Sequence, residues 1–462
     1  MGSKLHIIMF PWFAYGHIYP FIQLSNKLYS HGIQISFFSI PGNIDRIKCS
    51  LNLTPPNQLI SLTIPPVEGL PPNFDSSSDI TTETSELLKV ALDQMQPQIK
   101  TLLSQLKPQI ICFDFAHYWL PPIASELGIK AVYFSVFSAV SNSYLTIPAR
   151  MLDPTKQLTV EDLKNPPQGY PKTSITSVKT FQARNFQYIF KSFHGGPPVF
   201  ERVMSFITAC DATIYKTCTE IEGPYIDYLK TQIGKPLILA GPSVPPPPSG
   251  ELEEKWEHCL GNFPEKSVIF CNFGSETYLD NTQIQELTLG LELTGLPFFL
   301  VLNFGTSSVD AHAKLEATLP EGFQERIRDR GVVHTGWVQQ QHILAHRSVG
   351  CYLNHAGFSS VIEGIVNDCQ LAFVPQKGDQ FINSKFFSGD LKLGVEVNRR
   401  DEDGYFGKND ILKAIQTVMV DTDKEPGRFI RKNHSNWRMF FLDKEIETRY
   451  IENLVDELVV LA

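Results

Sequence analysis

The alternation of short apolar runs with helical segments constrains the fold of this chain more than any other feature. Apolar runs of strand length in the first half of the sequence cover residues 5–10, 33–39, 109–113 and 131–135. A second series covers residues 267–272, 297–302, 331–334, 350–353 and 371–375. Apolar strands that alternate with helices, such as the amphipathic helix predicted at residues 18–29, are typical of parallel sheets covered on both faces. The sequence therefore predicts an α/β fold with two parallel-sheet domains.

A proline-rich segment separates the two series. Residues 240–250 read AGPSVPPPPSG, and four consecutive prolines fit neither a helix nor a sheet interior, because proline lacks a backbone N–H. Such segments act as extended, semi-rigid spacers. We therefore predict a first domain over residues 1–240, a linker over 241–260 and a second domain over 261–440. A helix within residues 441–462 is expected to pack back on the first domain.

The composition excludes several classes of partner. The 462 residues include 40 Lys and Arg against 49 Asp and Glu, a net charge of −9, so the chain lacks the basic surface that nucleic acid requires. No apolar stretch reaches the roughly 18 residues of a membrane-spanning helix. The apolar start is too short for a secretory signal, and the eight cysteines form no C-x-x-C pair. We expect a cytoplasmic monomer with small-molecule partners, bound in a cleft between the two domains.

Several catalytic motifs are missing from the sequence. There is no G-x-x-x-x-G-K-[ST] phosphate loop and no G-x-G-x-x-G after the first strand, which disfavours ATPases and nicotinamide-dependent oxidoreductases. A G-x-S-x-G elbow and a zinc motif are also missing. Two D-x-D triplets, at residues 401–403 and 421–423, have carboxylates of the kind that bind divalent metals, but both lie in polar segments typical of solvated loops. We therefore expect no metal site.

The segment over residues 337–380 contains the most informative pattern. It is expected to include a strand at 350–353, a tight turn at 354–357 and a helix at 359–366. The start of a helix has free backbone N–H groups and the positive end of the helix dipole, which together favour a phosphate group. A phosphate-binding turn is therefore one interpretation of this segment.

The side chains near this turn suit other parts of a nucleotide. Gly357 allows close approach, and Ser359 and Ser360 offer hydroxyl groups. The Glu363 carboxylate lies one helical turn after Ser359, where it can accept hydrogen bonds from ribose. Trp337 offers a flat face to a base. The alternative is a structural unit in which Ser359 is an N-cap and Trp337 belongs to the core, and the residues alone do not decide between the two.

The 44 positions 337–380 resemble the signature box of the plant family-1 UDP-sugar-dependent glycosyltransferases. The resemblance extends over the whole chain and includes PWFAYGHIYPFIQLSNKL near the start, LILAGP before the linker and VIFCNFGSE before a long helix. The combination of FGSE with VNDCQ resembles the clade that adds a sugar to a sugar already on a flavonoid or related compound. It implies a GT-B fold, in which two Rossmann-like domains face each other across a cleft. The first domain would hold the acceptor and the second the UDP-sugar, a co-substrate, with no cofactor.

The resemblance also implies a set of donor-binding residues. Trp337 would stack on uracil while the Val338 backbone contacts it, and Gln340 and Glu363 would bind ribose. The residues implied for the diphosphate are Ser275, His355 and Ser360, with the backbone N–H of Phe358, and those implied for the donor sugar are Asp379 and Gln380. Gly357 and Ser359 complete the predicted UDP-sugar contacts. The box departs from the common pattern at Ala356, Phe358 and Ser359, where Cys, Trp and Asn are usual, and at Gln339, which replaces a common Pro. These departures leave the donor sugar open.

Two residues are candidates for the catalytic step. Imidazole is suited to proton transfer near neutral pH, and His17 lies in a GH-x-x-P pattern between the first strand and the first helix. Asp114 follows the strand at 109–113, and neighbouring parallel strands would bring its carboxylate towards His17 to orient the ring. The alternatives are a plain helix-start residue for His17 and an N-cap for Asp114. The resemblance implies that the pair is a catalytic dyad, with inversion in a single displacement and without a metal.

We predict an inverting UDP-glycosyltransferase that extends the sugar of a flavonoid or related glycoside, with glucose as the expected donor sugar and rhamnose or xylose as alternatives. The predicted acceptor contacts are Glu276, His117, Trp119 and Phe137. Glu276 follows the FGS turn and can accept hydrogen bonds from an acceptor sugar, or it can cap the next helix. The nearest alternative function is transfer to an aglycone, and a more remote one is a non-catalytic UDP-sugar-binding protein.

Overall fold

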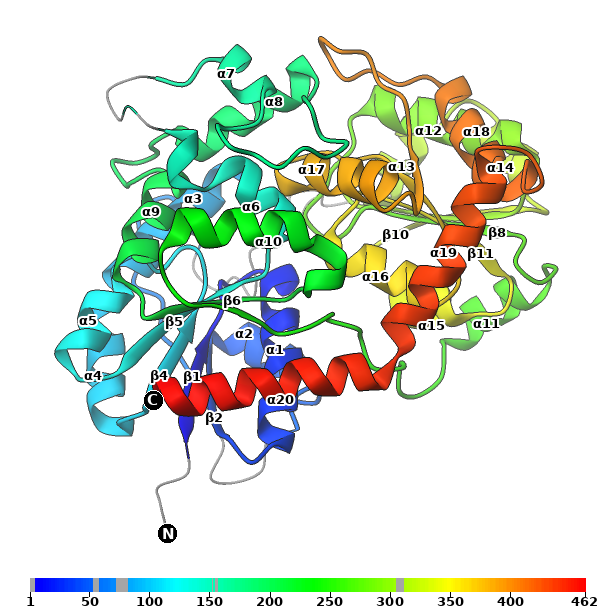
Figure 1. Cartoon of the computed structure of the whole chain (residues 1–462). Coiled ribbons are helices and arrows are strands. Elements are labelled where there is room, and N and C mark those ends of the chain that lie inside the picture. The colour runs from blue at the N-terminus through cyan, green and yellow to red at the C-terminus, as the bar shows by residue number, and fades with distance from the viewer. Residues whose placement is uncertain (1–4, 53–57, 72–81, 152, 154–156, 305–310) are drawn as a thin grey trace.

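The computed structural model describes residues 5–52, 58–71, 82–151, 153, 157–304 and 311–462, which form two α/β domains (Figure 1). The first has a seven-stranded parallel sheet in the order β3-β2-β1-β4-β5-β6-β7. Its strands are β1 (His6–Phe10), β2 (Gln34–Ser39), β3 (Gln58–Ser61), β4 (Ile110–Phe113), β5 (Lys130–Ser135), β6 (Ala212–Tyr215) and β7 (Leu237–Leu239).

The second domain has a six-stranded parallel sheet in the order β10-β9-β8-β11-β12-β13. Its strands are β8 (Val268–Asn272), β9 (Phe298–Leu302), β10 (Gly331–Thr335), β11 (Val349–Asn354), β12 (Gln370–Phe373) and β13 (Gly394–Glu396). All residues of β1, β4, β8 and β9 are buried, as expected for continuous apolar runs. The two sheets confirm the predicted α/β class with two Rossmann-like domains.

Both sheets reverse their strand order at their first strand. β1 lies between β2 and β4, and β8 lies between β9 and β11. In an open α/β sheet the ligand crevice lies at such a switch point, outside the carboxyl ends of the strands. The segments that follow β1, β4, β8 and β11 are therefore the places where a site is expected.

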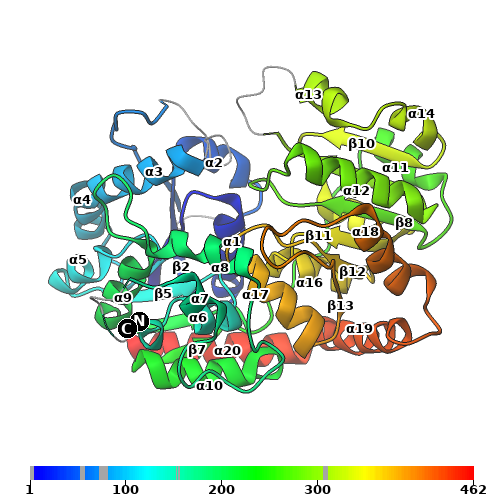
Figure 2. The same ribbon diagram turned by 90° about the horizontal axis from the view of Figure 1, so that it is seen from above.

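Figure 2 shows the domains side by side, each with helices around its sheet. The helices of the first domain are α1 (Tyr15–Ser30), α2 (Pro41–Ile47), α3 (Thr82–Gln94), α4 (Gln96–Leu106), α5 (Leu120–Glu126), α6 (Ala139–Leu145), α7 (Val160–Lys164), α8 (Thr180–Phe186), α9 (Val199–Ala209) and α10 (Thr219–Ile233). Those that follow are α11 (Glu254–Gly261), α12 (Asn281–Thr294), α13 (Ala311–Thr318), α14 (Phe323–Ile327), α15 (Gln340–Ala345), α16 (Phe358–Val366), α17 (Asp379–Lys385), α18 (Lys408–Ile415), α19 (Gly427–Leu442) and α20 (Lys444–Leu461). None of the helices in the described ranges is both long and apolar enough to cross a membrane.

The two domains contact each other through apolar side chains. One buried apolar cluster contains residues of both sheets. The rings of Tyr225 and Phe386 lie 5.8 Å apart, and those of Phe186 and Phe381 lie 6.0 Å apart. Thus α8 of the first domain packs against α17 of the second, and α10 packs against the residue that directly follows α17. This contact fixes how the switch points of the two sheets lie relative to each other.

The last helix returns to the first domain, as Figure 1 shows in red. α20 buries Ile451, Leu454 and Leu458 in a cluster with residues of β1 and β2. Gly241, where the linker begins, has a φ of +78°, and a Cβ there would lie 2.7 Å from Cβ of Tyr450. Only glycine allows the linker to pass this close to α20.

The structure corrects the predicted start of the first helix. α1 begins at Tyr15 and not at residue 18, because the Ala14 carbonyl accepts hydrogen bonds from the backbone N–H groups of His17 and Ile18, both at 2.9 Å. His17 is therefore in the first turn of α1 and not in the preceding loop. The sequence pattern also missed β3, β6, β7 and β13, which have three or four residues each.

Candidate active site

The switch point of the first sheet brings His17 and Asp114 together. His17 follows β1, and Asp114 directly follows β4, the strand that pairs with β1. Nδ1 of His17 lies 2.8 Å from Oδ2 of Asp114. Parallel strands end at the same edge of a sheet, so these side chains meet although they are 97 residues apart in sequence.

The Asp114 carboxylate is completely buried and holds a charge. Its Oδ2 also accepts the backbone N–H of Trp12 at 3.0 Å, and its Oδ1 accepts that of Phe115 at 2.7 Å. Burial alone would raise the pKa of this carboxyl, but His17 and the two N–H groups outweigh burial and hold the pKa below its usual value. The charged carboxylate therefore fixes Nδ1 as a donor and leaves Nε2 of His17 as an acceptor. Asp114 caps no helix, because α5 begins at Leu120.

Two phenylalanines surround the imidazole. The ring of His17 lies 5.2 Å from that of Phe115 and 5.3 Å from that of Phe137, centroid to centroid. Of the side chain of His17, 16% is exposed, so the ring is reachable from solvent. Phe137, a predicted acceptor contact, thus lies beside the candidate base.

The predicted acceptor contacts His117 and Trp119 lie deeper. His117 exposes none of its surface; its ring lies 4.1 Å from that of Phe10, and its Nδ1 lies 3.1 Å from the Asp114 carbonyl. Burial lowers the pKa of His117 to about 4, so its imidazole is neutral. Trp119 is 6% exposed. Contact of either residue with an acceptor stays a prediction, and in this structure both contribute to the core behind Asp114.

The predicted diphosphate turn forms between β11 and α16. The ring of His355 lies between two glycines: a Cβ on Gly274 would lie 3.1 Å from its Cε1, and a Cβ on Gly357 would lie 2.7 Å from its Nε2. Burial, together with the charge of the nearby Lys377, lowers the pKa of His355 to about 4. Nδ1 of His355 is buried without a hydrogen-bond partner. The turn thus holds a neutral imidazole with unused hydrogen-bonding capacity.

The first turn of α16 contains the other predicted diphosphate residues. Gly357 is its N-cap, so Ser359 does not have the capping role considered as an alternative. Phe358 is buried, Ser360 is half-buried, and Ser275 is exposed beyond the end of β8. The Ser359 hydroxyl instead accepts a hydrogen bond from Nζ of Lys216, in the first domain, at 2.9 Å. The sequence pattern missed Lys216, because it follows β6, whose short run ATIY was not predicted as a strand.

The predicted ribose residues are linked to each other. Nε2 of Gln340 donates to Glu363 at 2.6 Å, and Oε1 of Gln340 accepts from Asn272 at 2.8 Å. Glu363 is 7% exposed, and burial raises the pKa of its carboxyl. Gln341, which the sequence did not single out, donates to Glu363 at 3.4 Å and to the Tyr19 hydroxyl of the first domain at 2.9 Å. Amide groups therefore occupy the carboxylate that would bind ribose.

The part of the signature box that is predicted to bind uracil is exposed to solvent. Trp337 is 79% exposed, so it does not belong to the core as the alternative required, and its face is free to stack. Val338 is buried beside it. Gln339, which stands at a common proline position, holds the linker by accepting from the Glu253 N–H at 2.7 Å and donating to the Glu251 carbonyl at 3.0 Å.

The predicted donor-sugar residues begin α17. The Asp379 carboxylate accepts from Asn383 at 2.9 Å, and burial raises the pKa of Asp379. Oε1 of Gln380 accepts the backbone N–H groups of Gln376 and Lys377, so this oxygen is occupied by the preceding turn. Asn383 in turn accepts from the hydroxyl of Ser138, the N-cap of α6, at 2.6 Å. The sugar end of the box is thus tied to the first domain.

Glu276 lies beside the donor turn but does not cap the next helix. α12 has Asp280 as its N-cap, which rules out the capping role considered for Glu276. Nζ of Lys377 donates to the Glu276 carbonyl at 2.9 Å and lies 3.7 Å from its carboxylate. The side chain is 38% exposed, so it is accessible to an acceptor.

The two D-x-D triplets have structural partners. Asp401 accepts from the Thr180 hydroxyl at 2.5 Å, Asp403 pairs with Arg400 at 2.6 Å, and Asp421 pairs with Lys424 at 2.7 Å. Among the described residues, no three His, Cys, Asp or Glu side chains are grouped as a metal site would require.

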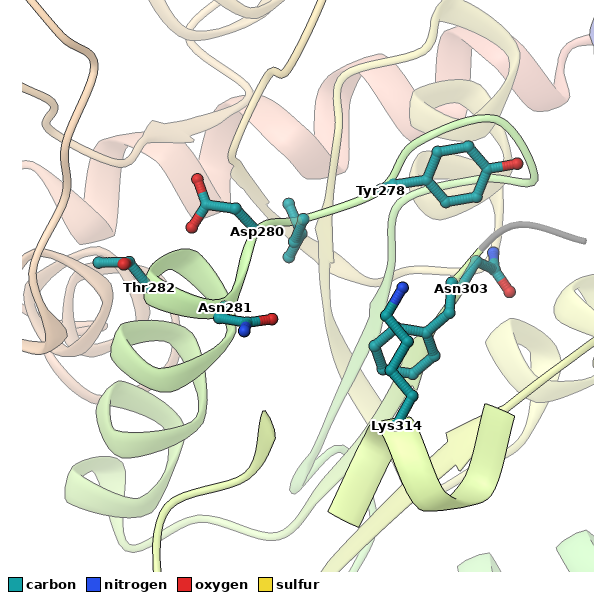
Figure 3. Close-up of a pocket in the computed structure, with 8 residues that line it drawn as sticks. Tyr278, Asp280, Asn281, Thr282, Asn303 and Lys314 are labelled. Atoms are coloured by element: carbon teal, nitrogen blue, oxygen red, sulfur yellow. The ribbon is translucent and has the colours of Figure 1, made fainter. Parts of the chain in front are cut away.

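A pocket of about 470 Å³ lies in the second domain, at the start of α12 (Figure 3). Its lining residues are Tyr278, Leu279, Asp280, Asn281, Thr282, Asn303, Phe304 and Lys314. Nδ2 of Asn303 donates to the Gly274 carbonyl at 2.9 Å, which places the pocket next to the turn that follows β8. None of the predicted site residues lines it.

Comparisons with known proteins identify the family of the chain. The profile of the UDP-glucoronosyl and UDP-glucosyl transferase family matches residues 322–442. The chain is 58% identical over 461 residues to an anthocyanidin-3-O-glucoside rhamnosyltransferase of Petunia hybrida, with 100% of this chain and 97% of that protein covered. It is 42% identical over 468 residues to an anthocyanidin 3-O-glucoside 2''-O-glucosyltransferase of Ipomoea purpurea, with 99% of each covered.

A solved structure shows the same fold. The Glycyrrhiza uralensis protein UGT73P12, complexed with glycyrrhetinic acid 3-O-monoglucuronide, aligns with a TM-score of 0.79 at 20% sequence identity. The alignment covers 99% of this chain and 96% of that one. Since the sequence identity to the Petunia and Ipomoea proteins extends over nearly their whole lengths, the chain belongs to the plant UDP-glycosyltransferase family.

Proposed function

We propose that this enzyme transfers a sugar from a UDP-sugar to a hydroxyl of the sugar that a flavonoid or related compound already carries. The observation that carries the chemistry is the buried, charged Asp114 at 2.8 Å from His17. The acceptor class is supported by the two relatives, both of which are named for an anthocyanidin 3-O-glucoside acceptor.

In the proposed reaction the acceptor hydroxyl gives its proton to Nε2 of His17. Its oxygen attacks the anomeric carbon of the donor, the bond from that carbon to the diphosphate breaks, and the electron pair leaves with UDP. Attack from the face opposite the leaving group inverts the anomeric centre. The Asp114 carboxylate stabilises the imidazolium, as it accepts the hydrogen bond from Nδ1.

The donor would be held by the second domain. Trp337 presents an exposed ring face to uracil, and Glu363 presents a carboxylate to ribose. The start of α16 presents its backbone N–H groups to the diphosphate. These groups offset the negative charge of the leaving UDP, so the proposed mechanism uses neither a metal nor an organic cofactor. Of the sugars expected from the sequence, rhamnose is favoured by the more similar relative, at 58% identity, and glucose by the relative at 42%.

The test crosses donors with acceptors. UDP-rhamnose, UDP-glucose and UDP-xylose are each combined with a flavonol and with its 3-O-glucoside, and product masses are measured by liquid chromatography and mass spectrometry. We expect a deoxyhexose or hexose to be added to the glucoside. Addition to the flavonol alone would move the enzyme to the aglycone class. Binding of UDP without any product would support the non-catalytic alternative.

We also propose that the protein is a cytoplasmic monomer. All eight cysteines are free, which suits a reducing compartment. The candidate base and the donor box belong to one chain, so the site requires no second copy. Light scattering after gel filtration would test the oligomeric state, and a fluorescent fusion in plant cells would test the location.

A further inference from the structure

Lys216 connects the first domain to the donor box. It directly follows β6 and is buried, with 3% of its surface exposed. Its Nζ donates to the Ser359 hydroxyl at 2.9 Å and lies 5.7 Å from the centre of the Phe358 ring. Ser359 and Phe358 are both in the first turn of α16. The ammonium group of Lys216, in the first domain, therefore lies at the start of α16, where the diphosphate is expected.

The nearby carboxylates only partly compensate the positive charge of this ammonium group. Its hydrogen bond is to a neutral hydroxyl, and the carboxylates that favour its charge are Asp379 on α17, Glu222 on α10, Asp114 after β4 and Glu363 on α16. Burial outweighs these carboxylates and lowers the pKa of Lys216 to about 8. A buried ammonium group gains stability when an anion binds beside it.

Three other features of this place also suit an anion. The N-terminus of α16 has the positive end of its dipole here. His355 has a buried Nδ1 without a hydrogen-bond partner, in the turn just before the helix. The Ser359 hydroxyl, which accepts from Lys216, has a proton of its own to donate. A diphosphate would bring negative charge to all of these groups at once.

We propose that Lys216 is a donor-binding residue whose ammonium group contacts the diphosphate of the UDP-sugar. The anion is then held from both domains, by Lys216 of the first and by the start of α16 of the second. This inference rests on the UDP-sugar donor of the proposed function. The competing interpretation is that Lys216 only compensates the four nearby carboxylates and stabilises the contact between the domains.

Binding measurements separate the two interpretations. Isothermal titration calorimetry is performed with UDP and with uridine, which lacks the diphosphate, on the wild type and on Lys216→Met, Lys216→Arg and Lys230→Met. Methionine keeps an unbranched apolar side chain without the charge, and arginine keeps the charge. Lys230 is an exposed lysine on α10 and provides the matched control. Thermal unfolding of each variant shows whether it is folded.

We expect Lys216→Met to weaken UDP binding at least tenfold and to leave uridine binding unchanged. Lys216→Arg should retain most of the affinity for UDP, and Lys230→Met should match the wild type with both ligands. An unchanged affinity of Lys216→Met for UDP, or an equal loss for UDP and uridine, would overturn the proposal. A wild type that binds neither ligand would overturn the proposed function as well. If the wild type binds UDP and Lys216→Met binds it equally well, only the role of Lys216 is overturned.

The pH dependence of the wild type gives a test that requires no variant. The charged form of Lys216 binds phosphate, and its pKa of about 8 means that this form is lost as the pH rises. UDP affinity should therefore fall between pH 7 and pH 9.5 while uridine affinity changes less, and UDP binding at pH 8.5 should take up protons from the buffer. Parallel pH curves for UDP and uridine would contradict the role of Lys216.

Discussion

The two domains differ in how far their site residues are already arranged for substrate. In the first domain, Asp114 already accepts hydrogen bonds from His17, Trp12 and Phe115, so the candidate base is oriented before any substrate binds. In the second domain, the Glu363 carboxylate is occupied by amide groups, and His355 has an unused nitrogen. The first domain is therefore built for the chemical step, and the second must exchange internal hydrogen bonds for those of the donor.

The largest effect should come from the first domain. His17→Ala removes the proposed base, so turnover should fall by about 10²–10⁴-fold or more. The affinity for UDP should stay near that of the wild type, because the predicted donor contacts lie in the second domain and in Lys216. Turnover is measured by product formation and affinity by calorimetry. His31→Ala, an exposed histidine just after α1, is the matched control. Retained turnover in His17→Ala would remove the base assignment.

Asp114→Asn tests whether the charge of the carboxylate matters beyond its shape. We expect turnover to fall roughly 10²-fold or more, because an amide neither stabilises the imidazolium nor fixes the tautomer. The amide NH₂ group would also face N–H donors, so unfolding free energy should fall by about 1–3 kcal/mol. Asp227→Asn, on the exposed surface of α10, provides the control. A variant with wild-type turnover would leave Asp114 with a structural role only.

The same carboxyl group predicts a pH dependence of stability. Its pKa in the folded state is lowered, so it stabilises the fold above its unfolded pKa of about 3.9, and this contribution is lost as the pH falls through the lower folded value. The melting temperature of the wild type should therefore approach that of Asp114→Asn as the pH falls below about 4. A difference between the two proteins that stays constant with pH would contradict a charged Asp114.

The second domain should respond in affinity more than in turnover. Glu363→Gln removes the charge that ribose hydroxyl groups would contact, and we expect roughly tenfold weaker binding of UDP. Turnover at saturating donor should change less, since the dyad is untouched. 2′-Deoxy-UDP provides the sharper comparison: if Glu363 contacts the 2′-hydroxyl, the variant and the wild type should bind this ligand more nearly alike. An equal loss for UDP and 2′-deoxy-UDP would contradict the contact.

The sequence predicted the fold well where the apolar runs were long. The predicted strand at residues 5–10 differs from β1 by one residue at its start, and that at 350–353 differs from β11 by one residue at each end. β6 reads ATIY, in which a polar threonine interrupts a short apolar run, so β6 was missed, and Lys216 was missed with it. Contacts between the domains left no signal either, because Gln341 and Tyr19 are 322 residues apart. Motifs identify residues that one segment brings together, whereas partners contributed by another domain require the three-dimensional structure.

The smallest effect we predict concerns Glu276, at the edge of the second domain. Its carboxylate is 38% exposed and 3.7 Å from Lys377, so a contact with an acceptor sugar would be partly screened by water. Glu276→Ala should raise the KM for a flavonol 3-O-glucoside by roughly threefold to tenfold and that for the aglycone by less. The KM of Glu276→Gln for the glucoside should lie between those of the wild type and Glu276→Ala. If the KM rises equally for both acceptors, Glu276 acts through the turn that Lys377 holds and not through an acceptor sugar. The preference for an acceptor sugar would then have to come from the first domain, close to Phe137 and the dyad.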